Sequence, residues 1–348
     1  MPHVQAEALR AFSEALLTAG GFAPGDARQT AELLVWANLR GIDSHGVLRI
    51  PRYVEMIDLG MMTSGGTVAQ VGGRGAVAVL DGGKCPGAVG MNAAVDKAAA
   101  LARDHGIGWC AARAISHAGA VGFFTGRLAE RGLVGLAMTA SKPLMSYHGA
   151  LGEALSTNPL SIAAPMGDGQ DPVILDMSTA AVALGKIMAA RDAGRAIPEG
   201  WAVDTEGRAT TDPGSVAALL PMAGAKGSGL SLMIEILTSV LAGNAVIGPF
   251  LAAGRNNGFN GMVLAIDPAA FGDPADFAAE VRALADAIHA LPPAAGVDWV
   301  LLPGERGAAT ARLRAETGIP LAAGTARRLV ALAGKLGVAV PEALAAAE

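Results

Sequence analysis

The segment Leu219-Leu-Pro-Met-Ala-Gly-Ala-Lys-Gly-Ser-Gly-Leu230 is the nearest approach in this chain to the G-x-G-x-x-G fingerprint of a Rossmann dinucleotide-binding unit. Its glycines, Gly224, Gly227 and Gly229, fall at the wrong spacing, which argues against that fold. A glycine-rich turn that opens a helix can still hold an anion, because free N–H groups and Lys226 would supply positive charge. The same turn could instead serve only to pack the helix closely.

On both sides of this segment, short β-rich runs alternate with helical patterns. The second helix of the chain is expected to begin at an N-cap near Asp26. Predicted strands cover residues 76–80, 108–112, 134–139, 160–164, 173–176, 262–266 and 299–302, and predicted helices cover 88–103, 121–131, 179–191, 308–314 and 325–336. We expect a helical N-terminal region (1–70), a mixed-sheet α/β domain with helical insertions (71–304), and a C-terminal helical segment (305–348) that packs back on the N-terminal region.

Composition excludes several classes of protein. Of the 348 residues, 52% are apolar and 16% are charged, which excludes a disordered chain. A net charge of −5 with interspersed signs offers no basic stripe for nucleic acid. The N-terminus carries charges where a signal peptide would be apolar, and the apolar stretch from Leu230 to Leu251 contains Glu235 and Pro249, as a buried helix and turn would. We expect a cytoplasmic globular protein that binds neither nucleic acid nor membrane.

The first candidate site is Gly41-Ile-Asp-Ser-His-Gly-Val-Leu-Arg-Ile-Pro-Arg-Tyr53. If this segment is helical, His45, Arg49 and Tyr53 stand four residues apart and share one face. An arginine fork is shaped to hold a carboxylate, and an imidazole can transfer a proton near neutral pH. A solvated helix face with an ordinary salt bridge would show the same pattern.

The second candidate is Ile115-Ser-His-Ala-Gly-Ala-Val-Gly122. A strand-like run ends near Ala114 and a helical pattern opens near Ala120, so we expect His117 in a strand-to-helix loop, where catalytic groups are often presented. The helix N-terminus should bias the imidazole toward its neutral form, as suits a proton acceptor. A buried loop histidine bonded to backbone is the alternative.

Two further loops, Thr157-Asn-Pro-Leu-Ser161 and Leu175-Asp-Met-Ser-Thr179, are rich in small polar groups at strand ends. Asp176 could orient a histidine, bind a ribose hydroxyl or cap the following helix, and capping is the commonest of these roles. No cluster of His, Asp or Cys side chains predicts a metal site.

Together these segments resemble the type-2 malate/L-lactate dehydrogenase family, which includes ureidoglycolate, sulfolactate and diketogulonate enzymes and the piperidine-2-carboxylate/pyrroline-2-carboxylate reductases. The motifs that carry the resemblance run in order along nearly the whole chain: GIDSHGVLRIPRY, SHAGAVGFF, STNPLSIAAP, ILDMSTAAVALGKI, IPEGWAVDTEGRATTDP, LLPMAGAKGSGLSLMIEIL and LLPGE. The resemblance implies a non-Rossmann NAD(P)-binding fold with a mostly antiparallel mixed sheet, a homodimer, and a substrate pocket between the helical N-terminal region and the sheet domain.

The resemblance also implies roles by motif position. His45 and His117 match the two acid/base histidines, without indicating which one transfers the proton, and Arg49 matches the carboxylate anchor. Tyr53, Lys142 and His148 are further candidates for substrate binding; Lys142-Pro143 and Ser146-Tyr147-His148-Gly149 depart from the commonest family pattern, so the substrate cannot be copied from a relative. The positions that match cofactor contacts are Ser141, Asn158, Asp176, Met177, Ser178, Lys226, Gly227, Gly304 and Glu305.

The expected activity is hydride transfer between NAD or NADP and C2 of a small 2-hydroxy or 2-keto acid. NAD is weakly favoured, because no Arg or Lys can be placed for the 2′-phosphate of NADP. A cyclic 2-imino-acid reductase would share every motif. A non-catalytic nucleotide-binding protein is the alternative from a different class.

Overall fold

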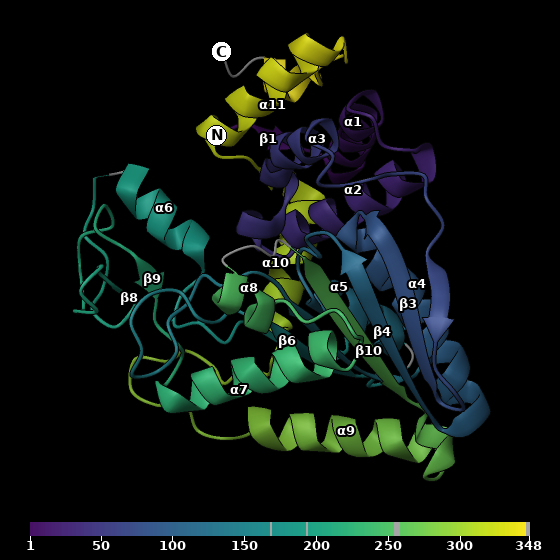
Figure 1. Cartoon of the computed structure of the whole chain (residues 1–348). Coiled ribbons are helices and arrows are strands. Elements are labelled where there is room, and N and C mark those ends of the chain that lie inside the picture. The colour runs from purple at the N-terminus through teal and green to yellow at the C-terminus, as the bar shows by residue number, and fades with distance from the viewer. Residues whose placement is uncertain (168, 193, 254–257, 346–348) are drawn as a thin grey trace.

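A seven-stranded sheet lies at the centre of the computed structural model, which describes residues 1–167, 169–192, 194–253 and 258–345 (Figure 1). Its strands follow the order β2 (Ala69–Gly72), β3 (Val77–Cys85), β4 (Ile107–Ile115), β10 (Phe259–Ile266), β5 (Val134–Ala140), β6 (Leu160–Ala164) and β7 (Val173–Met177). Within this sheet β3 and β4 are parallel, and the other five neighbouring pairs are antiparallel. The expected mostly antiparallel, non-Rossmann sheet is confirmed.

The parallel pair β3 and β4 is joined by helix α4 (Gly87–His105), which makes a single βαβ unit. The start of α4 is covered by the loop that carries His117, because the Gly87 N–H donates to Ser116 Oγ at 3.1 Å. A Cβ atom on Gly87 would lie 2.3 Å from the His117 carbonyl oxygen. This helix end therefore packs against protein and leaves no cradle for a phosphate.

Helices cover both faces of the sheet. Along β10, Val263 and Ala265 join the core beneath α4 and α5 (Gly122–Ala129), whereas Met262 and Leu264 pack with Ile234 of α7 (Ala225–Glu235) on the other face. This alternation is the period of two expected of a strand buried on both sides. The helix α7 continues as a π-helical turn, η3 (Ile236–Val240).

A second core joins the two ends of the chain. Apolar side chains from the N-terminal helices, including Leu16 and Leu34, pack with Leu329 and Leu344 near the C-terminus. Figure 1 shows α11 beside α1 and α3. The elements of this core are β1 (His3–Val4), α1 (Ala6–Ala19), α2 (Pro24–Leu39), α3 (Ile50–Asp58), β11 (Ile319–Pro320), α11 (Ala323–Leu336) and α12 (Glu342–Ala345). The exact domain boundaries stay a prediction.

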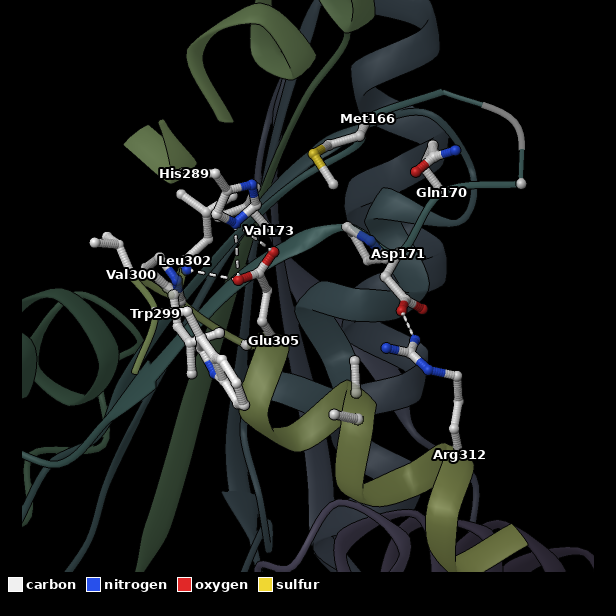
Figure 2. Close-up of a pocket in the computed structure, with 17 residues that line it drawn as sticks. Met166, Gln170, Asp171, Val173, His289, Trp299, Val300, Leu302, Glu305 and Arg312 are labelled. Atoms are coloured by element: carbon white, nitrogen blue, oxygen red, sulfur yellow. Dashed lines mark hydrogen bonds and ion pairs between the residues drawn. The ribbon is translucent and has the colours of Figure 1, made fainter. Parts of the chain in front are cut away.

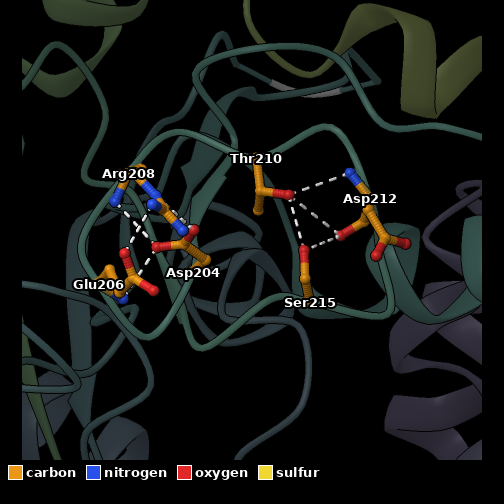
Figure 3. Close-up of polar contacts among 6 residues, drawn as sticks. All are labelled: Asp204, Glu206, Arg208, Thr210, Asp212 and Ser215. Atoms are coloured by element: carbon orange, nitrogen blue, oxygen red, sulfur yellow. Dashed lines mark hydrogen bonds and ion pairs between the residues drawn. The ribbon is translucent and has the colours of Figure 1, made fainter.

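The motif that includes Asp204 and Asp212 forms turns on a small hairpin-like lobe. Asp204 Oδ1 accepts the Arg208 N–H at 3.0 Å, and Thr210 Oγ1 lies 2.7 Å from Ser215 Oγ. Figure 3 shows these residues. These contacts close the chain between β8 (Ala202–Val203) and β9 (Ala218–Leu219), next to α6 (Leu184–Asp192). The remaining described elements are α8 (Ile247–Ala253), η4 (Pro268–Ala270), α9 (Pro274–His289) and α10 (Glu305–Thr317).

Several local predictions are wrong. Residues 299–302 form no strand; Ile174 of the edge strand β7 donates to the Pro303 carbonyl, but Pro303 has no N–H with which to continue a ladder. Asp26 is not an N-cap, since α2 begins at Pro24 and the Asp26 carboxylate holds Ser64 and Gly65 instead. The helix predicted from residue 179 begins at Leu184.

No helix in the described residues is long and apolar enough to cross a membrane.

Candidate active site

The segment that carries His45 is a pair of tight turns followed by a helix. Residues Asp43–His45 (η1) and Val47–Arg49 (η2) are 3₁₀ turns, and α3 begins at Ile50, so the expected continuous helix from Gly41 to Tyr53 is wrong. Gly46 separates the turns with an extended backbone, φ −90° and ψ −155°. A Cβ atom there would lie 2.1 Å from Asn38 Oδ1, which explains why glycine occupies this position.

Side chains from two helices fix these turns. Asn38 of α2 donates to Asp43 Oδ1 at 2.7 Å and accepts the Val47 N–H at 2.8 Å. Arg314 of α10 binds the same Asp43 carboxylate with both terminal nitrogens, at 2.7 and 3.2 Å. Such a two-bond fork fixes orientation as well as distance. The backbone that presents His45 is therefore held from both sides.

His45, Arg49, Tyr53 and His117 nevertheless meet in one cluster. The two imidazole rings stack with centroids 5.6 Å apart and an interplanar angle of 16°. Tyr53 Oη lies 2.7 Å from His117 Nδ1, and Ser44 Oγ lies 3.0 Å from His45 Nδ1, which leaves Nε2 of each ring for a ligand. Arg49 Nε donates to the Ser44 carbonyl at 2.8 Å, so its terminal nitrogens can bind elsewhere. We call these four residues the histidine cluster.

Burial favours the neutral forms of the two imidazoles and of Tyr53 in the histidine cluster. Desolvation and the nearby Arg49 charge lower the pKa of His45 to about 4. The same causes, with His45 in addition, lower the pKa of His117 well below its usual value. Desolvation also raises the pKa of Tyr53 to about 12. Two neutral imidazoles beside a fixed cation suit proton acceptance next to a bound anion.

His117 lies in a strand-to-helix loop, as predicted: β4 ends at Ile115 and α5 begins at Gly122. Its pKa is lowered, again as expected, but the causes are burial and neighbouring charge rather than the helix N-terminus. Asp176 caps that helix, because its Oδ2 accepts the Gly122 N–H at 2.9 Å. Of the three roles considered for Asp176, helix capping is therefore seen, but on α5 and not on the helix that follows Asp176 in the chain. Although Asp176 keeps solvent access, desolvation by surrounding protein raises its pKa to about 6, against the lowering effects of Gly122 and Arg40.

Most of the expected cofactor residues come together at neighbouring strand ends. Asp176 and Met177 of β7 pair with Ser161 and Leu160 of β6, directly after Asn158. Asn158 Nδ2 donates to the Ser231 carbonyl of α7 at 2.9 Å. Two serine contacts extend this edge: Ser231 Oγ to the Ser156 carbonyl at 2.9 Å, and Ser141 Oγ to Ser156 Oγ at 2.7 Å.

The glycine-rich turn before α7 packs on the same edge. Met222 donates its N–H to the Thr179 carbonyl at 2.9 Å, and a Cβ atom on Gly227 would lie 2.9 Å from that same oxygen. Lys226 is exposed at this turn, and Ser178 caps its own loop by accepting the Ala180 N–H at 3.1 Å. Asn158 Oδ1 and Thr179 Oγ1 are buried and have no hydrogen-bond partner among the described residues. Unpaired buried polar atoms are costly, so these two oxygens are unusual features of this edge.

Gly304 and Glu305 lie on the opposite side of β7, at the start of α10. Gly304 has φ +94° and packs on Ile174, and its carbonyl accepts Arg40 Nη2 at 3.0 Å. The Arg40 guanidinium also stacks 5.1 Å from the Trp36 ring centroid. Desolvation lowers the pKa of Arg40, while Asp171 and Asp176 oppose the shift. Arg40 therefore lies between the Asp176 edge and the start of α10.

A pocket of about 710 Å³ opens beside Gly304 and Glu305 (Figure 2). Trp299 and His289 line one side, and Asp171 and Arg312 form an ion pair on the other. In the part of the chain that the structure describes, no group of three His, Cys, Asp or Glu side chains is placed to hold a metal.

Comparison with known proteins shows the family of this chain. The family model for malate/L-lactate dehydrogenase matches residues 4–330. The chain belongs to the malate/L-lactate dehydrogenase family. It is 33% identical over 350 residues to malate dehydrogenase from Pyrococcus horikoshii, covering 96% of each chain, and 34% identical over 313 residues to ureidoglycolate dehydrogenase (NAD(+)) from Escherichia coli O157:H7, covering 87% of each. It is 35% identical over 309 residues to (2R)-3-sulfolactate dehydrogenase (NADP(+)) from Chromohalobacter salexigens, covering 87% of this chain and 90% of the relative.

A solved structure with the same fold is delta1-piperideine-2-carboxylate reductase from Pseudomonas syringae pv. tomato. The TM-score is 0.84 at 28% identity, covering 95% of this chain and all of the other. The family match and these relatives establish that the protein is an oxidoreductase.

Lys142 and His148 were expected near the substrate, but the contacts described for them are with residues outside the histidine cluster. Lys142 is exposed and acts electrostatically on Glu153, and the His148 backbone N–H donates to Ser228 Oγ at 2.9 Å. Sequence reasoning missed Arg40, Asp171, Trp299 and Arg312. Arg40 directly precedes the His45 motif and could have been noticed from its place; the other three carry no motif signal.

Proposed function

We propose that the protein transfers a hydride between NAD(P) and C2 of a small 2-hydroxy or 2-keto acid, with the histidine cluster as the substrate end of its site. The observation that carries this proposal is the stacked pair His45 and His117 beside Arg49. A substrate carboxylate on the terminal nitrogens of Arg49 would fix C2 next to both imidazoles. Such positioning supplies much of the rate in reactions of this kind.

His117 is our candidate for the proton-transferring residue. Its Nδ1 is held by Tyr53 Oη at 2.7 Å, a shorter contact than the 3.0 Å between His45 Nδ1 and Ser44 Oγ. In the oxidative direction Nε2 of His117 would take the hydroxyl proton while Nδ1–H donates to the Tyr53 oxygen. In the reductive direction the protonated ring would return that proton. His45 would hydrogen-bond the same substrate oxygen and orient it.

The cofactor would lie along the strand ends between the histidine cluster and the pocket beside Glu305. Asn158, Asp176 to Ser178, Lys226 and Gly227 would hold it at one end, and Gly304 with Glu305 at the other. When bound, its nicotinamide ring accepts or donates the hydride. We favour NAD over NADP. A homodimer and a cytoplasmic location stay predictions from the sequence.

A cyclic 2-imino-acid reductase is the second candidate function, which the structural similarity to delta1-piperideine-2-carboxylate reductase favours. The same carboxylate anchor and the same proton donor would serve a ring nitrogen in place of an oxygen.

A substrate panel tests both candidates. Oxidation of NADH and NADPH would be followed at 340 nm with 2-keto acids (pyruvate, oxaloacetate, sulfopyruvate) and with cyclic 2-imino acids of five- and six-membered rings. We expect turnover of at least one 2-keto acid, with His117→Asn as the matched inactive control. Turnover of the cyclic imines alone would establish the second candidate, and no turnover of any compound would reject both.

A further inference from the structure

We propose that the Asp171–Arg312 ion pair sets the choice of cofactor and excludes NADP; this inference rests on the proposed function, because it takes the pocket beside Glu305 as the site of the adenosine end. Asp171 lies just before β7, and Arg312 lies on α10, two turns after Glu305. Figure 2 shows the pair facing the pocket across from Trp299.

The pocket has the size and lining for an adenosine group. Its volume is about 710 Å³, and its walls are chain segments rich in small and apolar residues beside Trp299, a residue that is 67% exposed. An indole face open to a cavity is suited to stacking on a nucleobase. Gly304 and Glu305, two of the residues expected to contact the cofactor, line the same pocket.

Of the two carboxylates in the pocket, Asp171 is the one free to meet a ribose. Both oxygens of Glu305 are engaged, Oε1 with His289 Nε2 at 2.9 Å and Oε2 with the Leu302 N–H at 2.8 Å. Asp171 binds Arg312 through Oδ2, and in the described ranges no hydrogen bond to its Oδ1 is present. An acidic side chain that accepts from the ribose 2′-hydroxyl is the usual means of selecting NAD.

The cation that a 2′-phosphate would require is present but held. Arg312 could accept such a phosphate, as arginine does in NADP-binding sites, yet its Nη1 is paired with Asp171. A 2′-phosphate at this place would therefore be repelled by the Asp171 carboxylate, while the Arg312 guanidinium that could bind it is already paired. Removing the Asp171 charge should remove the repulsion and release Arg312 in one step.

The pair can be broken without unfolding the protein. Both side chains are more than half exposed, 54% for Asp171 and 67% for Arg312, and exposed pairs contribute little to stability. The test is Asp171→Asn, with NADH and NADPH binding measured by isothermal titration calorimetry, so that no substrate is needed. We expect NADPH to bind about 10-fold or more tightly and NADH several-fold more weakly, which reverses or abolishes the preference.

Four further variants identify the cause. Arg312→Met in the Asp171→Asn background should abolish the gain in NADPH affinity, and alone it should change NADH affinity by less than about threefold. Trp299→Ala should weaken both cofactors by the same factor, roughly 5- to 150-fold, because stacking does not distinguish them. Asp96→Asn, which breaks another exposed pair, with Arg131, is the control and should leave both affinities unchanged.

An unchanged NADH-to-NADPH affinity ratio in Asp171→Asn would overturn the inference while leaving the proposed function standing. So would a wild-type protein that binds NADPH more tightly than NADH. Failure of the folded wild-type protein to bind either cofactor would instead overturn the proposed function and this inference together.

Discussion

The histidine cluster and the pocket beside Glu305 are built on opposite principles. In the histidine cluster Tyr53 is 3% exposed, hydrogen bonds join neighbouring side chains, and burial holds both imidazoles neutral. In the pocket the charged side chains Asp171 and Arg312 are more than half exposed and paired with each other. The first region can perform proton chemistry because its imidazoles are held neutral beside Arg49, and the second can select a ligand because its charges stay accessible.

This difference predicts how substitutions will act. A change in the histidine cluster alters groups that are desolvated and mutually dependent, so it should lower turnover by large factors. A change in the pocket alters exposed charges with little effect on stability or chemistry, so it should change which cofactor binds. The predictions below test this contrast in the histidine cluster, from the largest effect to the smallest.

His117→Asn should give the largest loss. Asparagine can keep a hydrogen bond to Tyr53 Oη, but it cannot accept or return a proton. We expect kcat/KM to fall about 10²- to 10⁴-fold, the usual contribution of a general acid–base group. NADH affinity, measured by calorimetry, should be unchanged, because the loss lies at the substrate end. His45→Asn is the matched comparison, and a larger loss in that variant would exchange the two roles.

Arg49→Lys should give the intermediate loss. Arg49 Nε donates a hydrogen bond to the Ser44 carbonyl. Within the described residues no carboxylate lies within ion-pair distance of the Arg49 guanidinium. Lysine keeps the charge but cannot bind both Ser44 and a substrate carboxylate through a fork. Losing one charged hydrogen bond costs about 1.5–3 kcal/mol, or roughly 10- to 150-fold in kcat/KM.

The melting temperature separates this role from a structural one. If Arg49 binds substrate, Arg49→Lys should melt close to the wild-type temperature while kcat/KM falls. A lower melting temperature with near-normal activity per folded molecule would instead make Arg49 a structural residue and remove it from the site.

The sequence predicted the strands of the sheet better than the turns around the site. The runs at 160–164 and 134–139 match β6 and β5 closely, because short runs rich in apolar residues between polar or glycine-containing segments are typical of strands, although Ile162 of β6 is exposed. The run at 299–302 looks equally apolar, but whether it pairs depends on Pro303 and on a neighbouring edge that the sequence does not place. The same limit explains why Trp299 and Asp171 were missed: they line the same pocket but are separated by more than a hundred residues in the sequence.

The histidine cluster was predicted for a partly wrong reason. His45, Arg49 and Tyr53 were expected on one helix face, whereas two 3₁₀ turns and one helix bring them together. The partnership between Tyr53 and His117 spans 64 residues and depends on how α3 packs against the end of β4. Local spacing could indicate which residues carry chemistry, but not which of them touch.

The smallest expected effect is that of pH on the oxidation of the 2-hydroxy acid. The base is a neutral imidazole, so protonation removes activity as pH falls through the pKa of the free enzyme, which kcat/KM reports. Burial and Arg49 lower that pKa to about 4 for His45 and well below 6.5 for His117. From pH 8 to 5.5 we therefore expect kcat/KM to change less than about twofold, whereas an unshifted histidine would lose about tenfold.

Asp176, with a pKa near 6, titrates in the same range, and Asp176→Asn is the control that removes its contribution. A fall in kcat/KM with an apparent pKa of about 6.5 that persists in Asp176→Asn would show that the histidines are solvated. The histidine cluster would then not differ from the pocket in the way argued above.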